Sequence, residues 1–236
     1  MFKLLKQRLI KQLNHRVIQP VSYLYYKFRY RFFDPSEKTI RIQVSNITAW
    51  YRGNRYSKIT FPGQIKGGDW SENLSSREEI LNNGKKFNGI IQRYEEDIPW
   101  RETDLFKVRY QKKIDEGEKV HGFDNLDELE NYYRNRYDKL FTRIQSDGIL
   151  PASDRNPEIA PIYIHIGRDG KILFTVDGNH RLCFCMILGI EEIPVRVWMR
   201  HRKWQEKREY ILGKNGKDIR PDYQEFLTHP DIKSDL

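Results

Sequence analysis

The stretch that most constrains the fold runs from Thr175 to Val197 and reads TVDGNHRLCFCMILGIEEIPVRV. It changes character twice within a short distance. An apolar β-branched run ends in Asp-Gly-Asn-His-Arg, a compact apolar segment follows, and a second β-branched run closes the stretch. These changes predict a strand, a tight turn, a short buried helix and a second strand. The chain is therefore expected to mix strands and helices in one domain.

The neighbouring segments predict further strands and point to an α+β fold. Residues 39–47 alternate and are rich in β-branched side chains, which predicts the first strand. Residues 162–176 contain alternating isoleucines, an Arg-Asp-Gly turn and a returning apolar run, as in a hairpin. Residues 193–199 predict the strand that follows the short helix. Residues 61–70 carry three glycines, and we expect them to form a tight loop.

Helices are predicted in three other parts of the chain. Residues 75 to about 122 are heavily charged with both signs, and we expect them to be helical. A second helix is predicted over residues 124–148, with Asp124 as its N-cap and Gly148 as its stop, because apolar residues recur at i+3 and i+4. A third is predicted from Arg200 to Leu212. The residues after it are expected to be a loose end.

The composition fits a chain of 236 residues with one good-sized domain and a large insertion, since 38% of residues are hydrophobic and 13% are aromatic. We expect three regions: a basic aromatic segment over residues 1–36, a domain over residues 37–212, and a tail over residues 213–236. The domain is expected to contain a helical insertion at about residues 71–136. Its small sheet is expected to be mixed.

The expected cellular location of the protein rests on features that the sequence does not contain. No uncharged run approaches the roughly 20 residues that a membrane span needs, and no export signal opens the chain. The only cysteines, Cys183 and Cys185, stand two apart, a spacing that fits neither a metal site nor a disulfide framework. We expect a cytoplasmic protein, either free or peripheral at the inner face of the membrane.

The formal charge of +9 indicates an anionic partner, and its distribution is uneven. Residues 1–33 hold eight Lys and Arg and no acid, interleaved with Tyr and Phe. Three interpretations remain open for this segment: a helix packed on the domain with a solvated basic face, an interfacial helix on an anionic membrane, or a nucleic-acid contact. Nucleic acid is the least favoured of these, because no DNA-reading module is recognisable.

The Asp-Gly-Asn-His-Arg turn is a candidate phosphate site. Gly178 lets the backbone approach an anion, and the following helix start offers unpaired N–H groups. Asn179, His180 and Arg181 stand in that first turn, where Arg181 is a planar donor matched to phosphate. Asp177 could hold Mg²⁺ or accept a proton. The alternative is a common Asp-Gly turn in which His and Arg only cap the helix and face solvent.

Three blocks together resemble the ParB/sulfiredoxin superfamily domain: IRIQVSNI, LFTRIQSDGILPAS, and PIYIHIGRDGKILFTVDGNHRLCFCMILGIEEIPVRV. The resemblance covers roughly residues 38–70 and 137–200, with about 65 residues inserted between them. The Asp-Gly-x-His-Arg form is most similar to the ParB-like free serine kinases. That resemblance implies a phosphoryl transfer from ATP or ADP, with CTP as a further possibility, to a hydroxyl group with Mg²⁺.

The sequence also departs from branches of this superfamily. Sulfiredoxins, which the turn resembles, have their catalytic cysteine at the position of Asn179. Sulfinic acid reduction is therefore not expected. Chromosome-partitioning ParB proteins carry Gly-Glu-Arg-Arg at the turn and a following DNA-binding domain, and only about 36 residues follow Arg200 here. The acid that the kinases have near the first strand has no clear counterpart.

Asp69 is our candidate for the missing acid, because it follows a glycine-rich loop after the first strand. Asp69 and Asp177 would then divide the roles of proton acceptor and metal ligand. The alternative for Asp69 is an N-cap. Lys66, Arg200 and His201 are candidate anion contacts, with a solvated basic face as the alternative for the basic run that Arg200 opens.

The sequence therefore predicts a nucleotide-binding phosphotransferase that acts on a hydroxyl of a small or lipid-linked acceptor. Two alternatives stay open. One is a ParB-like protein associated with nucleic acid, or a nuclease. The other is a nucleotide-switched binding protein without phosphoryl transfer.

Overall fold

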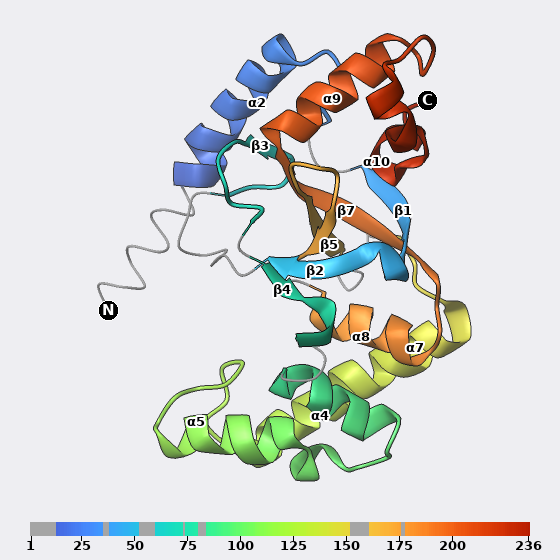
Figure 1. The fold of residues 1–236 in the computed structure, drawn as a ribbon. Coiled ribbons are helices and arrows are strands. Elements are labelled where there is room, and N and C mark those ends of the chain that lie inside the picture. The colour runs from blue at the N-terminus through green and yellow to red at the C-terminus, as the bar shows by residue number, and fades with distance from the viewer. Residues whose placement is uncertain are drawn as a thin grey trace.

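A computed structural model describes residues 13–34, 38–51, 60–72, 74–79, 84–151, 161–175 and 178–236. Within these ranges the strands form one mixed sheet, and helices gather at both of its ends (Figure 1). The expected α+β class is confirmed. Seven strands are described: β1 (Thr39–Gln43), β2 (Ile47–Tyr51), β3 (Gln64–Lys66), β4 (Leu74–Ser76), β5 (Ile162–Ile166), β6 (Ile172–Phe174) and β7 (Glu192–His201).

The sheet has the strand order β1-β7-β5-β6-β2-β4, and β3 pairs with β7 outside this path. β5 and β6 form the expected antiparallel hairpin, whereas β5 and β7 run parallel. β7 is long enough to pair with β1 near its start and with β3 near its end. The strand side chains that point into the domain are mostly apolar and buried, and together they form one continuous hydrophobic core.

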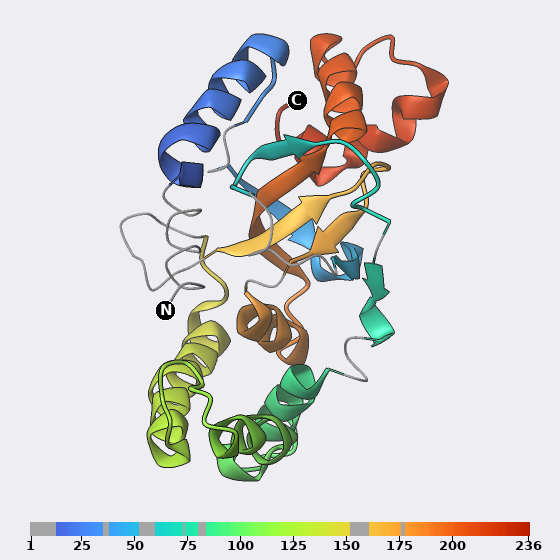
Figure 2. The same cartoon turned by 90° about the vertical axis from the view of Figure 1, so that its left-hand side faces the viewer.

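The helical elements fall into two groups (Figures 1 and 2). One group lies near β1, β3 and the end of β7. It consists of η1 (Asn14–Ile18), α2 (Gln19–Arg29), α9 (Arg202–Gly213), η6 (Pro221–Thr228) and α10 (Pro230–Lys233). The other extends from the opposite end: α4 (Lys85–Tyr94), η3 (Trp100–Glu102), η4 (Leu105–Tyr110), α5 (Gln111–Asp115), α6 (Leu126–Tyr133), η5 (Arg134–Asp138), α7 (Lys139–Asp147) and α8 (Asn179–Ile187). We call residues 84–147 the helical layer. A short 3₁₀ turn, η2 (Val44–Asn46), lies between β1 and β2.

Two expectations about the first strand region are wrong. Residues 39–47 are not one strand, because β1 pairs with β7 while β2 pairs with β6 and β4, and η2 carries the chain between these positions. Residues 61–70 are not only a loop, because β3 pairs with the end of β7. Gly63 and Gly68, with φ of 75° and 88°, supply the bends on either side of β3.

The helical expectations hold in part. The 75–122 region opens with the end of β4 and then breaks into separate helical segments rather than one long helix. The N-cap of α6 is Asn125 and not Asp124: the Asn125 Oδ1 accepts hydrogen bonds from the backbone N–H groups of Asp127 and Glu128, at 2.7 and 3.3 Å. Gly148 does end α7, with φ of 71°.

The expected loose C-terminal end is also wrong. α10 inserts Asp231 beneath the end of β7, where its carboxylate accepts hydrogen bonds from Arg200 Nη2 at 2.6 Å and Nε at 2.9 Å. Trp204 Nε1 donates to the same carboxylate at 2.9 Å. Asp231 and Trp204 are both 0% exposed. The last segment is therefore part of the core, held by a buried ion pair.

The two ends of β5 fix the positions used below. Ile162 pairs with Val195 at the end next to α8, which we call the helical end of the sheet. Ile166 pairs with Arg200 at the other end, where the β5–β6 turn lies, and we call this the hairpin end.

Candidate functional site

Gly178 opens α8 in a conformation that requires glycine. Its φ is 89°, in the left-handed region, and a Cβ placed there would lie 3.1 Å from the Cα of Ile162. The first helical hydrogen bond runs from the Leu182 N–H to the Gly178 carbonyl at 2.9 Å. The N–H groups that precede Leu182 therefore have no partner within the helix. The predicted turn is thus a helix start at the helical end of the sheet.

His180 points into the helical layer and not toward solvent. Its ring stacks on Tyr137 at 3.7 Å with an interplanar angle of 18°, and the residue is 7% exposed. Its Nε2 is buried and has no hydrogen-bond partner among the described residues. Burial, and then the neighbouring charge of Lys86, hold the pKa of His180 well below its ordinary value of 6.5. The imidazole is therefore neutral at pH 7, and it places a polar atom without a hydrogen-bond partner inside the helical layer.

Arg181 is partly buried on the α7 side of the same turn. Burial, and then the nearby Arg136, lower the pKa of Arg181, and Arg143 adds to the same effect. It shares a small cavity with residues of α7 and the segment after it: Leu140, Arg143, Ile144, Gly148, Ile149 and Leu150. Asn179 beside it is partly exposed. The turn thus sits in a strongly cationic environment.

The helical layer contributes cations that the sequence did not single out. We call Lys86 of α4, Arg109 of η4 and Arg136 of η5 the insertion cation cluster, and the imidazole of His121 lies beside them. Burial, and then Arg109, lower the pKa of Lys86 to about 8. Burial, and then Lys86 and the two arginines, lower the pKa of His121. These side chains are close enough to repel one another electrostatically.

No carboxylate in the described parts of the chain forms an ion pair with any member of this cluster. The absence is notable because ion pairs are common elsewhere in the same helical layer. Arg134, two residues from Arg136, pairs with Glu130 at 2.6 Å, and Lys113 pairs with Glu118. The positive charge around His180 is therefore not neutralised within the described structure.

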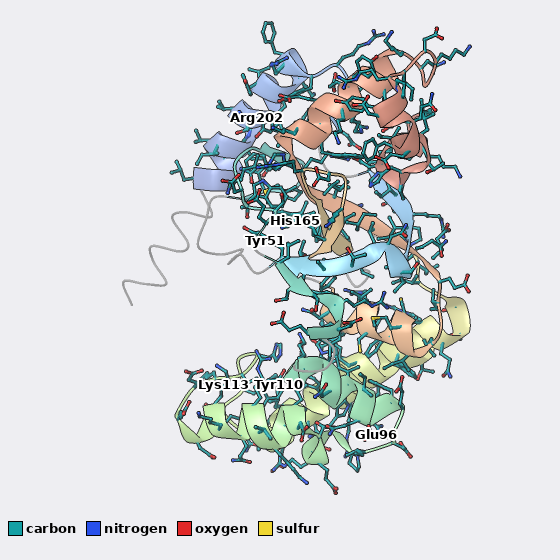
Figure 3. All side chains as sticks on the ribbon, viewed as in Figure 1. Tyr51, Glu96, Tyr110, Lys113, His165 and Arg202 are labelled. Atoms are coloured by element: carbon teal, nitrogen blue, oxygen red, sulfur yellow. The ribbon has the colours of Figure 1, made fainter. Side chains whose placement is uncertain are left out.

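Tyrosines connect the insertion cation cluster to the turn. Tyr110 and Tyr133 share a hydrogen bond between their hydroxyl groups, and the Tyr133 hydroxyl lies 3.3 Å from His121 Nε2. The Arg136 guanidinium lies 5.9 Å from the centroid of the Tyr137 ring that stacks on His180. Figure 3 labels Tyr110 within the helical layer, well away from the sheet residues that it labels. Tyrosine side chains and cations of the helical layer therefore lie next to one another beside the start of α8.

The other predicted site residues lie at the hairpin end of the sheet. Asp69 has a side chain that is 76% exposed, and it accepts a hydrogen bond from Arg168 Nη2 in the β5–β6 turn at 2.7 Å. Lys66 pairs with His201 in the β3–β7 register. His201 Nε2 lies 2.8 Å from the Gly68 carbonyl oxygen, and its Nδ1 caps α9 by accepting from the Lys203 N–H.

The structure does not bring these residues to the turn. Gly178 contacts Ile162 at the start of β5, whereas Asp69 contacts Arg168 beyond its end, and six residues of extended chain span roughly 20 Å. The glycine-rich loop therefore does not bring Asp69 to the predicted phosphate turn, and its expected role beside Asp177 has no support in this geometry. Arg200 and His201, at 2% and 1% exposure, also have no surface that an external anion could reach.

Asp177, the predicted metal ligand, lies outside the described residues. Among the residues that are described, no group of three His, Cys, Asp or Glu side chains is arranged to hold a metal ion. The structure therefore neither places nor excludes the carboxylate that follows β6.

No protein-family model matches the chain, and no curated protein or solved structure is significantly similar to it. Within the described part of the chain, no helix has both the length and the apolar character that crossing a bilayer requires. The superfamily resemblance thus remains a prediction, and the geometry of the turn must carry any functional argument.

Proposed function

We propose that this chain is a nucleotide-dependent phosphotransferase with a ParB/sulfiredoxin-like domain. The phosphates of ATP or ADP bind at Gly178–Arg181, and a phosphoryl group passes to a hydroxyl of a small or lipid-linked acceptor. The observation that carries this proposal is the insertion cation cluster, whose charges have no described acidic partner and which lies beside a helix start.

An anion resolves the electrostatic problem that this arrangement creates. Cations that lie close together raise the free energy of the folded chain, since each lowers the stability of its neighbour's charge. A phosphate group would accept hydrogen bonds from N–H groups at the start of α8 and from the cations around them. Each charge-assisted hydrogen bond of this kind contributes about 1.5–3 kcal/mol.

The graded burial of these side chains favours a small ligand over a polymer. His180 is buried, and Lys86 is partly buried, whereas Arg109, His121 and Arg136 remain exposed around them. Nucleic-acid backbones are held by cations spread along an accessible face. Cations arranged from the surface inward toward a helix start are better matched to the terminal phosphates of a nucleotide.

Phosphoryl transfer at such a site asks mainly for positioning and neutralisation of charge. The bond from the transferred phosphorus to its bridging oxygen breaks, a bond to the acceptor oxygen forms, and the hydroxyl proton leaves to a base. Asp177 directly precedes the turn, and a carboxylate there suits either the proton or Mg²⁺, which would neutralise phosphate charge when bound. Asp69 is not used in this proposal, because it lies at the hairpin end.

Calorimetric titration tests the binding step. ATP, ADP and CTP are titrated into the wild type, Arg181→Ala and Arg134→Ala. The last variant removes an exposed, ion-paired arginine of the same layer and serves as the matched control. We expect Arg181→Ala to weaken nucleotide binding by about 1.5–3 kcal/mol, with no loss in the control. Absence of affinity for all three nucleotides would refute the proposal.

Transfer is tested separately with labelled ATP and a panel of hydroxyl compounds, read by mass spectrometry. A phosphorylated acceptor is the expected product. Nucleotide binding without turnover or transfer for any acceptor would favour the alternative of a nucleotide-switched binding protein.

A further inference from the structure

The helix over residues 13–29 has two apolar faces, and only one of them packs on the domain. Tyr26 and Tyr30, at 8% and 5% exposure, belong to a small core with Phe61 and Ile65. The Tyr26 hydroxyl donates to the Ile65 carbonyl at 2.8 Å, and the Tyr23 hydroxyl donates to the Pro62 carbonyl at 2.5 Å. These contacts fix the helix to the β3 segment and determine which face is turned outward.

The outer face carries a row of large apolar side chains in solvent. We call it the α2 outer row: Leu13 (52% exposed), Val17 (50%), Val21 (62%), Leu24 (73%), Tyr25 (58%) and Phe28 (92%). At 100° per residue the four positions within α2, Val21 to Phe28, span an arc of about 100°, opposite the inner tyrosines. Of the nine exposed large hydrophobic residues in the described chain, six lie in this row. Isolated exposed apolar residues are ordinary, but a contiguous row of them marks a contact surface.

Cations border the row on both sides. On the same helical projection, exposed Lys27 falls beyond one edge of the arc, and exposed Arg29 falls beyond the other. No acidic residue occurs anywhere in residues 1–33. Both views show α2 on the outside of the molecule, with its far side facing away from the sheet (Figures 1 and 2).

We propose that the α2 outer row lies on an anionic lipid bilayer. The apolar side chains enter the boundary between headgroups and acyl chains, and the flanking cations meet lipid phosphates and carboxylates. Charge complementarity decides the occupant. A second copy of this chain could cover the apolar row, but it would bring two sets of cations together with no acid between them. An anionic surface satisfies the apolar and the cationic parts at once. This inference does not depend on the proposed function.

Vesicle flotation with the full chain provides the first test. Vesicles of phosphatidylcholine alone are compared with vesicles that also contain phosphatidylserine. We expect the wild type to float with the anionic vesicles, and Leu24→Glu/Phe28→Glu to lose at least about tenfold in partitioning. Both positions are exposed, so the fold should tolerate the change. Val108→Glu, at another exposed apolar position in η4, is the matched control and should float like the wild type.

A probe at the row identifies the contact directly. Cys183 and Cys185 are buried, and burial raises the pKa of each thiol to about 12, so an introduced thiol reacts selectively. An environment-sensitive dye on Leu24→Cys should shift to shorter wavelength with anionic vesicles, whereas the same dye on Val108→Cys should not.

Three results would overturn the inference. The first is a wild-type protein that stays in the soluble fraction at physiological salt. The second is a double glutamate variant that floats as well as the wild type. Light scattering could also show a dimer that Leu24→Glu/Phe28→Glu dissociates, with no vesicle binding, which would assign the row to a second copy of the chain.

Discussion

Two groups of basic side chains lie at opposite ends of the sheet, and they differ in how their charge is balanced. At the hairpin end, Arg200 pairs with Asp231, and Arg208 donates to the Asp231 carbonyl at 3.0 Å and to the carboxylate of Asp235. At the helical end, Lys86 and its partners in the insertion cation cluster have no carboxylate within the described structure. Both groups are basic, but within the described structure only the first has carboxylates that balance its positive charge.

The difference separates structural charge from binding charge. A buried arginine with its acid belongs to the fold, because removing either member leaves the other without compensation. A half-buried cation with no acid adds nothing to stability and is retained at a cost. Its compensation must come from beyond the residues that the structure describes. The predictions below vary charge at each end and ask whether stability or ligand affinity responds.

The largest effect is expected at the hairpin end. Asp231→Asn should lower the free energy of unfolding by about 3–5 kcal/mol, because it leaves Arg200 buried without a counter-charge. Denaturant unfolding measures the change. Asp222→Asn is the matched control: it breaks an exposed pair with Arg220 in the neighbouring segment and should leave the free energy of unfolding nearly unchanged.

The pH dependence of stability gives an independent check on the same pair. Burial alone would raise the pKa of Asp231, but Arg200 outweighs it and holds that pKa well below its ordinary value of 3.8. A carboxylate with a lowered pKa stabilises the fold fully above its unfolded value and loses this effect as the pH falls. Acid destabilisation should therefore be weaker in Asp231→Asn. If that variant unfolds at the same denaturant concentration as the wild type, the pairing has no structural role.

At the helical end the sign should reverse. Lys86→Met removes a desolvated ammonium while keeping an unbranched side chain, so the free energy of unfolding should rise by about 1–3 kcal/mol. Affinity for the tightest-binding nucleotide should fall by a similar amount, about 1.5–3 kcal/mol. Unfolding and calorimetric titration on the same samples separate the two effects.

Lys113→Met is the control for this substitution. Lys113 belongs to the same helical layer but pairs with Glu118, so it should change neither quantity by more than about 1 kcal/mol. A Lys86→Met protein that binds nucleotide normally would show that the unpaired cations are not a ligand site.

A smaller effect is expected from pH. Burial, and then Arg109, lower the pKa of Lys86 to about 8, so its ammonium form predominates only below that pH. Nucleotide affinity should be level near pH 7 and fall by up to about tenfold per pH unit above about 8, while the phosphate charge stays constant. Lys86→Arg keeps its charge and should abolish the decline. An identical pH profile in Lys86→Arg would assign the titration to another group.

Local patterns predicted much of the sheet and its helices. The β5–β6 hairpin, α8, β7 and α9 follow from alternation, turn residues and short apolar runs that lie next to one another in the sequence. Gly178 was predictable for the same reason. The inward direction of His180 also had a signal, since it stands four residues before the buried Phe184 on one face of α8.

Long-range charge balance was not predictable. The basic run that Arg200 opens looks like an anion-binding patch until Asp231, 31 residues later, is seen to pair with it. The insertion cation cluster draws on residues from 86 to 136, in a region where acids outnumber Lys and Arg, and only the fold shows which cations lack a partner. β3 has three residues, too few for a pattern, and its partner strand lies far along the chain.

The smallest effect is expected at Asp69, where sequence and structure disagree. If Asp69 were the catalytic base, Asp69→Asn would reduce the rate of phosphoryl transfer by about 10²–10⁴-fold. Its placement at the hairpin end, exposed and paired with Arg168, instead predicts a change of no more than about 1 kcal/mol in stability and none in nucleotide affinity or transfer. Single-turnover transfer and calorimetric titration of Asp69→Asn and Asp177→Asn distinguish the two. A large loss of transfer in Asp69→Asn alone would mean that the chemistry occurs at the hairpin end, and the insertion cation cluster would then need a different ligand.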